Sequence, residues 1–165
     1  MPVYVHNNQF GPPVNISAFV AAAQAAAAPG GQLPMLGGPG NNLGVNATAA
    51  APIGPVAGVT RAFGLITCAS VIYVSTNVAA AAAAWVHHAN AGHVGIADVN
   101  AAIVALGNPP VASILVIFAH PGAQDAGYNG SIATIAAQGI PANNIVEIPN
   151  LLVPQFGINN LGMIG

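Results

Sequence analysis

Full charges are almost absent from this chain, and their absence limits what its surface can recognise. Only four of the 165 residues carry one, namely Arg61, Asp98, Asp125 and Glu147. Average soluble domains are about a quarter charged, so Asn, Gln, Ser, Thr, Gly and backbone groups must supply the polar surface here. The formal net charge of -2 provides no basic patch for nucleic acid or for an anionic membrane. Weak charge repulsion favours either self-association or a tolerance for crowding.

The chain is long enough for one domain with a hydrophobic core, and its composition changes near residue 58. Residues 1–58 are rich in Gly, Pro and Asn, which predicts few long regular elements. The exception is NISAFVAAAQAAAA, where Asn15 or Ser17 is a suitable N-cap for an alanine-rich helix. We expect this N-terminal part to pack on a core formed by residues 59–165, within one domain overall.

The first half of that core predicts a β-hairpin. The β-branched stretch GLITCASVIYVS, residues 64–75, is typical of a buried strand. VAAAAAAWVHH, residues 78–88, is its expected partner, joined to it by a turn at STN. This partner assignment opposes the helix propensity of alanine.

The second half predicts two helices and two more strands. Asp98 is a candidate N-cap for a helix that Gly107 ends, and VASILVIFAH, residues 111–120, predicts a buried strand. A turn at YNG, a helix capped by Ser131 and a strand at NNIVEIP follow. The whole order predicts an α/β (α+β) sandwich, with a mixed β-sheet core and flanking helices in a single domain.

A membrane span is the alternative to the hairpin, because residues 62–86 are uncharged and numerous enough to cross a bilayer. Hydroxyl and amide side chains interrupt the run, and no positive cluster flanks it, so the hairpin is preferred. The start MPVYVHNN lacks the regions of a secretory signal. A single cysteine excludes an internal disulfide framework.

That cysteine, Cys68, is the first candidate for chemistry. Cysteine catalysis needs a thiolate, an imidazole that takes and returns the proton, and backbone amides that hold the oxyanion. In the predicted hairpin, Cys68 and His87 lie on neighbouring strands, where they are able to face each other. Only one of His87 and His88 can share the face of Cys68, because successive side chains of a strand alternate. The competing interpretation is a buried cysteine that serves only in packing.

Two other histidine motifs allow different interpretations. In HHANAGH, His87, His88 and His93 resemble a metal-ligand set that Cys68 or Asp98 would complete. In FAHPGAQD, His120 and Asp125 follow a predicted strand, at an edge where ligands often bind. We favour a thiol site over a metal site, a loop-capping role for His120 and Asp125, and no cofactor.

Residues 60–150 resemble the catalytic domain of the cytotoxic necrotizing factor type of bacterial toxin. The Burkholderia lethal factor and the bacterial chemotaxis receptor deamidase are similar. Leu65 and Cys68 match the cysteine motif of this family, and Val86 and His87 match its histidine motif. The helix from residue 98 and the strand near residue 114 follow in family order.

Two positions depart from the family pattern. Ile66 and Thr67 replace the small residues that precede the cysteine, where the backbone must turn sharply. Ala62 stands at the place of a threonine that orients the histidine in some members. Thr60, or a backbone carbonyl, is the expected substitute, so the resemblance implies a site of Cys68, His87 and Thr60.

The resemblance implies hydrolysis of a glutamine side chain to glutamate on a target protein, without a cofactor. Relatives that are toxins act in the host cytosol on GTPases or translation factors after secretion by a bacterium, and the chemotaxis branch acts on receptors. Two other hypotheses remain: a non-catalytic, structural or self-associating protein in which Cys68 is buried, and a cysteine protease or transglutaminase with the same pair of residues.

Overall fold

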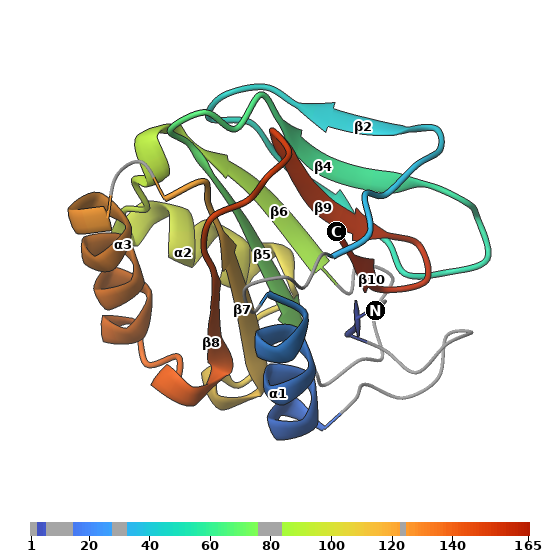
Figure 1. Ribbon diagram of the computed structural model, residues 1–165. Helices are drawn as coiled ribbons and strands as arrows, with labels where there is room; N and C mark the ends of the chain where they lie inside the picture. The colour runs from blue at the N-terminus through green and yellow to red at the C-terminus, as the bar shows by residue number, and fades with distance from the viewer. Residues whose placement is uncertain (1–2, 6–14, 28–32, 76–83, 123–124) are drawn as a thin grey trace.

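The computed structural model describes residues 3–5, 15–27, 33–75, 84–122 and 125–165. They form two five-stranded mixed sheets and three α-helices in one α+β domain (Figure 1). This architecture confirms the predicted fold class. The predicted turn at STN lies largely outside the described residues, since only Ser75 of that motif is included.

The first sheet is built mainly from the two ends of the chain. Its strand order is β1 (Val3–Tyr4), β10 (Met163–Ile164), β9 (Gln155–Asn159), β4 (Val59–Phe63) and β2 (Gly40–Leu43). The β2–β4 pair is parallel, and the other pairs are antiparallel. The local sequence does not predict a strand at these five places, because they are short and lie among Gly, Pro and Asn.

The second sheet contains the predicted hairpin. Its strand order is β3 (Thr48–Ala51), β6 (Ala84–Ala89), β5 (Ala69–Ser75), β7 (Ile114–Ala119) and β8 (Ile145–Ile148). Strands β5, β7 and β8 confirm the strands predicted within residues 64–75, 111–120 and 143–149, and β6 confirms the end of the alanine-rich segment as the partner of β5. Ala84, which directly precedes Trp85, therefore adopts the extended state, because pairing with β3 and β5 outweighs its helix propensity.

Two hydrophobic cores lie on opposite faces of the second sheet. One lies between the two sheets and includes the buried face of α1 (Ile16–Ala27). The other lies under α2 (Ile96–Ala105) and α3 (Asp125–Ala137), which cover the outer face of the same sheet (Figure 1). Strand β5 is buried along its whole length because it is covered on both faces.

Helix starts were predicted with mixed success. The first helix is confirmed, with the Asn15 side chain accepting a hydrogen bond from the Ala18 amide at 3.3 Å. Asp98 is not the N-cap of α2, because the helix starts earlier and Gly95 occupies that position. Asp98 instead lies in the first turn, where its Oδ2 accepts a hydrogen bond from the Gly95 amide at 2.8 Å.

The predicted YNG turn and Ser131 cap are wrong, since all four residues lie within α3. Tyr128 is fully buried in the outer core. Ser131 is also buried and bridges two backbone groups, donating to the Gly92 carbonyl at 2.6 Å and accepting from the Val94 amide at 2.9 Å. Tertiary packing of these two side chains thus outweighs the local turn preference.

Candidate functional site

The β5–β6 ladder determines which side chains can meet Cys68. Ser70 pairs with His88, and Val71 pairs with His87. Because faces alternate along a strand, Cys68, Ser70 and His88 lie on the face that turns toward the first sheet. Cys68 belongs to the core between the sheets, while Val71 belongs to the core under α2 and α3.

His87 therefore lies on the opposite face from Cys68, contrary to the expected pairing. The observed register pairs His87 with Val71, and a shift of one residue would be needed to bring His87 to the face of Cys68. His87 lies under α2, where burial lowers its pKa below the ordinary value of 6.5. Asp98 of α2 acts in the opposite direction, and His88 adds to the lowering.

His88 is fully buried and held by the first sheet. Its Nδ1 lies 2.8 Å from the carbonyl oxygen of Leu43, at the end of β2. A carbonyl only accepts, so Nδ1 carries the hydrogen and Nε2 is left with a lone pair. Nε2 is buried and has no hydrogen-bond partner among the residues that the structure describes. This combination is that of an imidazole oriented to accept a proton.

Cys68 precedes β5 and is 6% exposed. Its Sγ lies 4.0 Å from Oδ1 of Asn90, which is exposed and begins the short helical turn after β6. Beside it, the Ser70 hydroxyl donates to the Phe156 carbonyl at 2.9 Å. Cys68, Ser70, His88 and Asn90, here called the thiol cluster, thus line one face at one end of the ladder.

Thr60 lies in the other sheet, on β4, and is 7% exposed. No hydrogen bond joins it to His87 or His88, all three of which are described. The structure therefore does not assign Thr60 the orienting role that the family pattern implied. The Leu43 carbonyl occupies that role for His88, which matches the alternative of a backbone carbonyl.

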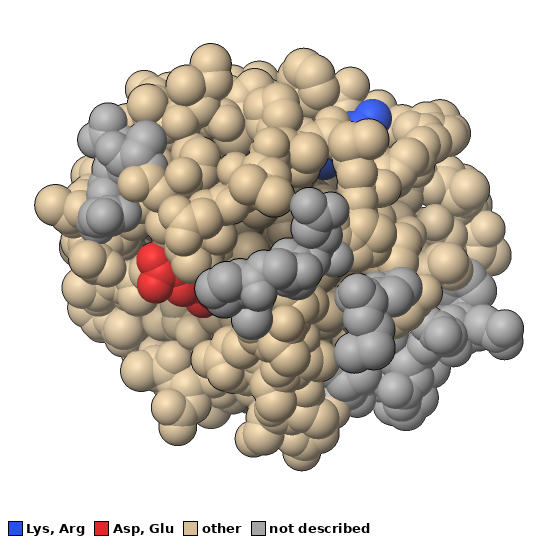
Figure 2. Space-filling model, in the orientation of Figure 1, with Lys and Arg blue, Asp and Glu red and all other residues tan. Residues whose placement is uncertain are grey.

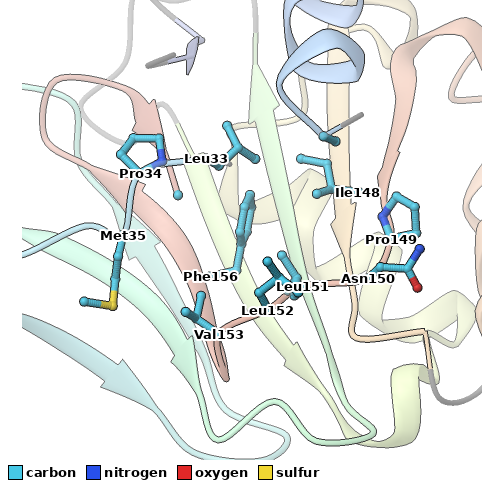
Figure 3. Close-up of a pocket in the computed structure, with 12 residues that line it drawn as sticks. Leu33, Pro34, Met35, Ile148, Pro149, Asn150, Leu151, Leu152, Val153 and Phe156 are labelled. Atoms are coloured by element: carbon cyan, nitrogen blue, oxygen red, sulfur yellow. The ribbon is translucent and has the colours of Figure 1, made fainter. Parts of the chain in front are cut away.

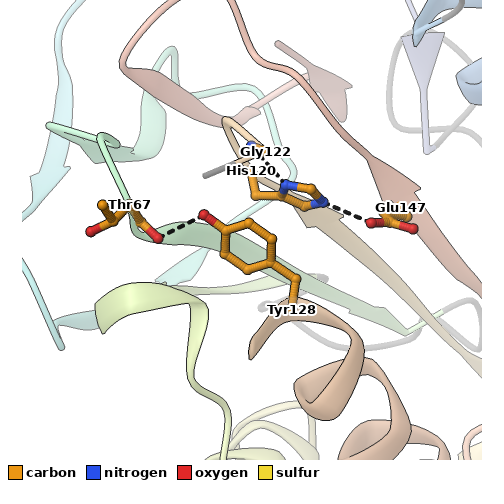
Figure 4. A network of polar contacts seen from close by, with 5 residues as sticks. All are labelled: Thr67, His120, Gly122, Tyr128 and Glu147. Carbon is orange, nitrogen blue, oxygen red and sulfur yellow. Dashed lines mark hydrogen bonds and ion pairs between the residues drawn. The ribbon is translucent and has the colours of Figure 1, made fainter. Parts of the chain in front are cut away.

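His120 forms a separate network on the other face of the sheet (Figure 4). Its Nδ1 accepts a hydrogen bond from the Gly122 amide at 3.0 Å, so its Nε2 donates to Oε1 of Glu147 at 2.7 Å. Tyr128 stacks on the imidazole with 4.0 Å between ring centroids. The Tyr128 hydroxyl donates to the Thr67 carbonyl at 2.8 Å, next to Cys68.

This network confirms the loop-capping interpretation for His120, because both ring nitrogens already have partners. Asp125, for which the same role was predicted, is the first residue of α3. The charged partner of His120 is Glu147, which the parallel pairing of β7 and β8 brings to the same end of the sheet.

The HHANAGH motif does not assemble a metal-ligand set in the described part of the chain. No group of three or more His, Cys, Asp or Glu side chains lies close enough there to hold a metal ion. His87 and His88 point to opposite faces of β6, and His93 is exposed.

Three groups that contact Cys68 or His88, or share their face of the ladder, were not predicted from the sequence: the Leu43 carbonyl, Ser70 and Asn90. Ser70 and Asn90 carry a readable signal, because a hairpin that pairs residue 69 with residue 89 also places Asn90 opposite Cys68. The position of Leu43 carries no such signal, since it depends on how the two sheets pack.

No protein-family model matches the chain, and no curated protein matches it.

The surface confirms the scarcity of charge seen in the sequence. On the face drawn in Figure 2, coloured side chains appear only as isolated spots. The guanidinium group of Arg61 is held by two hydrogen bonds. Its Nε donates to the Asn42 side chain and an Nη group donates to the Leu36 carbonyl, both at 2.6 Å. Across the described residues, no helix combines the length and the hydrophobicity that crossing a bilayer would require.

Proposed function

We propose that this chain is a cysteine-dependent deamidase that converts a glutamine side chain of a target protein to glutamate. Cys68 is the nucleophile, and His88, in place of His87, is the general base. The observation that carries the proposal is the shared face of Cys68 and His88, with the His88 imidazole oriented by the Leu43 carbonyl. The resemblance to the deamidase toxins supports the same reaction.

The chemistry follows from the tautomer of His88. Nε2 takes the proton of the Cys68 thiol, and the sulfur attacks the carboxamide carbon. The C–N bond then breaks, and the imidazolium returns the proton to the departing ammonia. A water molecule, deprotonated by Nε2, cleaves the thioester and releases the glutamate side chain and the free thiol.

The burial of Cys68 and the neutral surface define how a target must bind. Since Cys68 is only 6% exposed, the substrate must present glutamine as an extended side chain that enters beside Asn90. With few surface charges, recognition rests on shape and hydrogen bonds rather than on electrostatic steering. A protein target fits these demands better than a charged metabolite.

The test combines alkylation with product analysis. Iodoacetamide should modify Cys68 in the folded chain, and the neutral dipeptide carbobenzoxy-Gln-Gly should release ammonia and yield the glutamate product. Cys68→Ser is nearly isosteric and should abolish the release while keeping the circular dichroism spectrum. Full activity in Cys68→Ser would place the nucleophile elsewhere. Incorporation of an added primary amine would instead indicate a transglutaminase.

A structural, self-associating protein is the second candidate function. The deep burial of Cys68 and the near absence of charge favour it. In that case, iodoacetamide would react only as fast as the whole chain unfolds, because a buried thiol becomes accessible only on opening. The rate of unfolding can be measured by hydrogen exchange of the β5 amides. Alkylation of Cys68 that is much faster than this rate excludes the candidate.

A further inference from the structure

An open cavity of about 350 Å³ lies beside the connection between β8 and β9. Its wall combines three parts of the chain: the segment after α1, the β8–β9 connection and β9 itself. Figure 3 shows the side chains of Leu33, Ile148 and Phe156 gathered around one space. The volume falls within the range of about 300–1,000 Å³ that is typical of small-molecule sites.

The described side chains that line this cavity are mainly apolar, and none of them is charged. Leu33, Met35, Ile148, Leu151 and Phe156 supply large apolar groups, and Asn150 is the polar side chain among the described lining residues. An anion placed there would lose hydration without gaining a counter-charge from these side chains. The lining therefore discriminates against anionic ligands.

The rim keeps apolar side chains in water. Met35 is 64% exposed, Leu152 is 79% exposed and Val153 is 37% exposed. All three belong to the lining. An occupant of the cavity would cover them, and the flexible Met35 side chain can adapt to its shape.

The wall is preformed, because hydrogen bonds hold the β8–β9 connection at several points. The Leu151 amide donates to the His120 carbonyl at 3.1 Å. The Pro154 carbonyl accepts from the Gly64 and Leu65 amides at 2.7 and 2.9 Å. A preformed site loses less conformational entropy when it binds a ligand.

A second cavity, of about 810 Å³, has a different character. Gly, Pro, Ala and Asn residues of segments 39–41 and 50–60 line most of it. Four larger apolar side chains, Ile53, Val56, Val59 and Ile158, lie among these small residues. A substitution at Val56 therefore distinguishes this cavity from the first one.

We propose that the cavity bounded by Leu33, Met35, Ile148, Leu151 and Phe156 binds a small, uncharged and mainly apolar molecule. The ligand would lie against Phe156 and Leu151, with Met35, Leu152 and Val153 closing over it. This site is separate from the thiol cluster and does not depend on the deamidase proposal.

A matched pair of fluorescent probes tests the class of ligand. N-Phenyl-1-naphthylamine is neutral, and 8-anilinonaphthalene-1-sulfonate has the same rings with an added sulfonate. We expect saturable binding of the neutral probe to the full chain, at one site per chain, and at least tenfold weaker binding of the anionic probe. The Cys68→Ser variant should bind the neutral probe equally well. Absence of saturable binding, or equal affinity for both probes, would overturn the proposal.

Rim variants locate the probe. Met35→Asp introduces a charge at an exposed position. It should weaken the binding of the neutral probe at least tenfold without unfolding the chain. Val104→Asp, at a position on α2 that is 63% exposed, is the matched control and should leave binding unchanged. Val56→Asp tests the larger cavity. Loss of probe binding in Val56→Asp with normal probe binding in Met35→Asp would refute the assignment. Analytical ultracentrifugation provides a second test. Release of the bound probe when the chain self-associates would also refute the assignment.

Discussion

His88 and Leu43 join the two sheets through a hydrogen bond of 2.8 Å between the Nδ1 atom and the carbonyl oxygen. The bond lies in the buried space between the sheets, where it fixes both the tautomer and the orientation of the ring. The same bond leaves Nε2 without a described partner on the face of Cys68. This arrangement makes the two adjacent histidines of β6 unequal in a way that experiments can measure.

The first prediction separates these two histidines. His88→Ala and His88→Asn should each lower the hydrolysis of carbobenzoxy-Gln-Gly by about a hundredfold or more, because the general base is lost. His88→Asn keeps a side-chain N–H donor and so controls for damage to the fold. His87→Ala should retain most of the activity. The reverse pattern would require His87, and not His88, to reach the thiol.

The second prediction concerns His87 and the pH dependence of stability. Burial lowers its pKa in the folded state below 6.5, so the unfolded chain binds this proton at a higher pH. The contribution of neutral His87 to the stability of the folded chain is therefore fully present above about pH 6.5. It is lost progressively as the pH falls below that value. Urea unfolding at pH 7.5 and 5.0 should show a smaller loss of stability in His87→Gln than in the wild type. An equal loss in both proteins would contradict the assignment.

The third prediction concerns Gly92, which has a φ of +69° and packs against the Tyr128 ring. A Cβ atom at this position would overlap the ring. Gly92→Ala should therefore lower the free energy of unfolding by clearly more than roughly 1–2 kcal/mol, which is the cost of placing a residue other than glycine in the left-handed conformation. Gly107→Ala is the control, because Gly107 has a φ of +83° but open space around it. Thermal unfolding of both variants measures the difference, and equal losses would exclude the overlap.

The fourth prediction concerns the buried hydroxyl of Ser131. Ser131→Ala removes the partner of the Val94 amide and of the Gly92 carbonyl, which should cost about 2–3 kcal/mol of unfolding free energy. Thr134→Ala, one turn further along α3, loses an exposed bond to the Gly130 carbonyl at 3.0 Å. Its effect should be near zero, since alanine has the higher helix propensity. Chemical denaturation that gives similar values for both would refute the bridging role.

Local sequence patterns were sufficient where one signal acts within one element. The apolar run around Ile117 predicts a buried strand wherever it packs, and Asn15 can cap a helix without distant partners. The scarcity of charge is likewise a property of composition alone. In contrast, Tyr128 and Ser131 carry local turn and cap preferences that their buried contacts in α3 outweigh.

The sequence by itself determined the hairpin that carries Cys68 and the two histidines, because its strands are β-branched or buried apolar segments. It did not determine which histidine faces the thiol, since a shift of one residue in register exchanges the two faces of a strand. Only the tertiary structure decided this, by pairing Ser70 with His88 and by bringing the carbonyl of Leu43 from the other sheet onto that ring. Such contacts join residues far apart in the chain, and they depend on packing that no local pattern encodes.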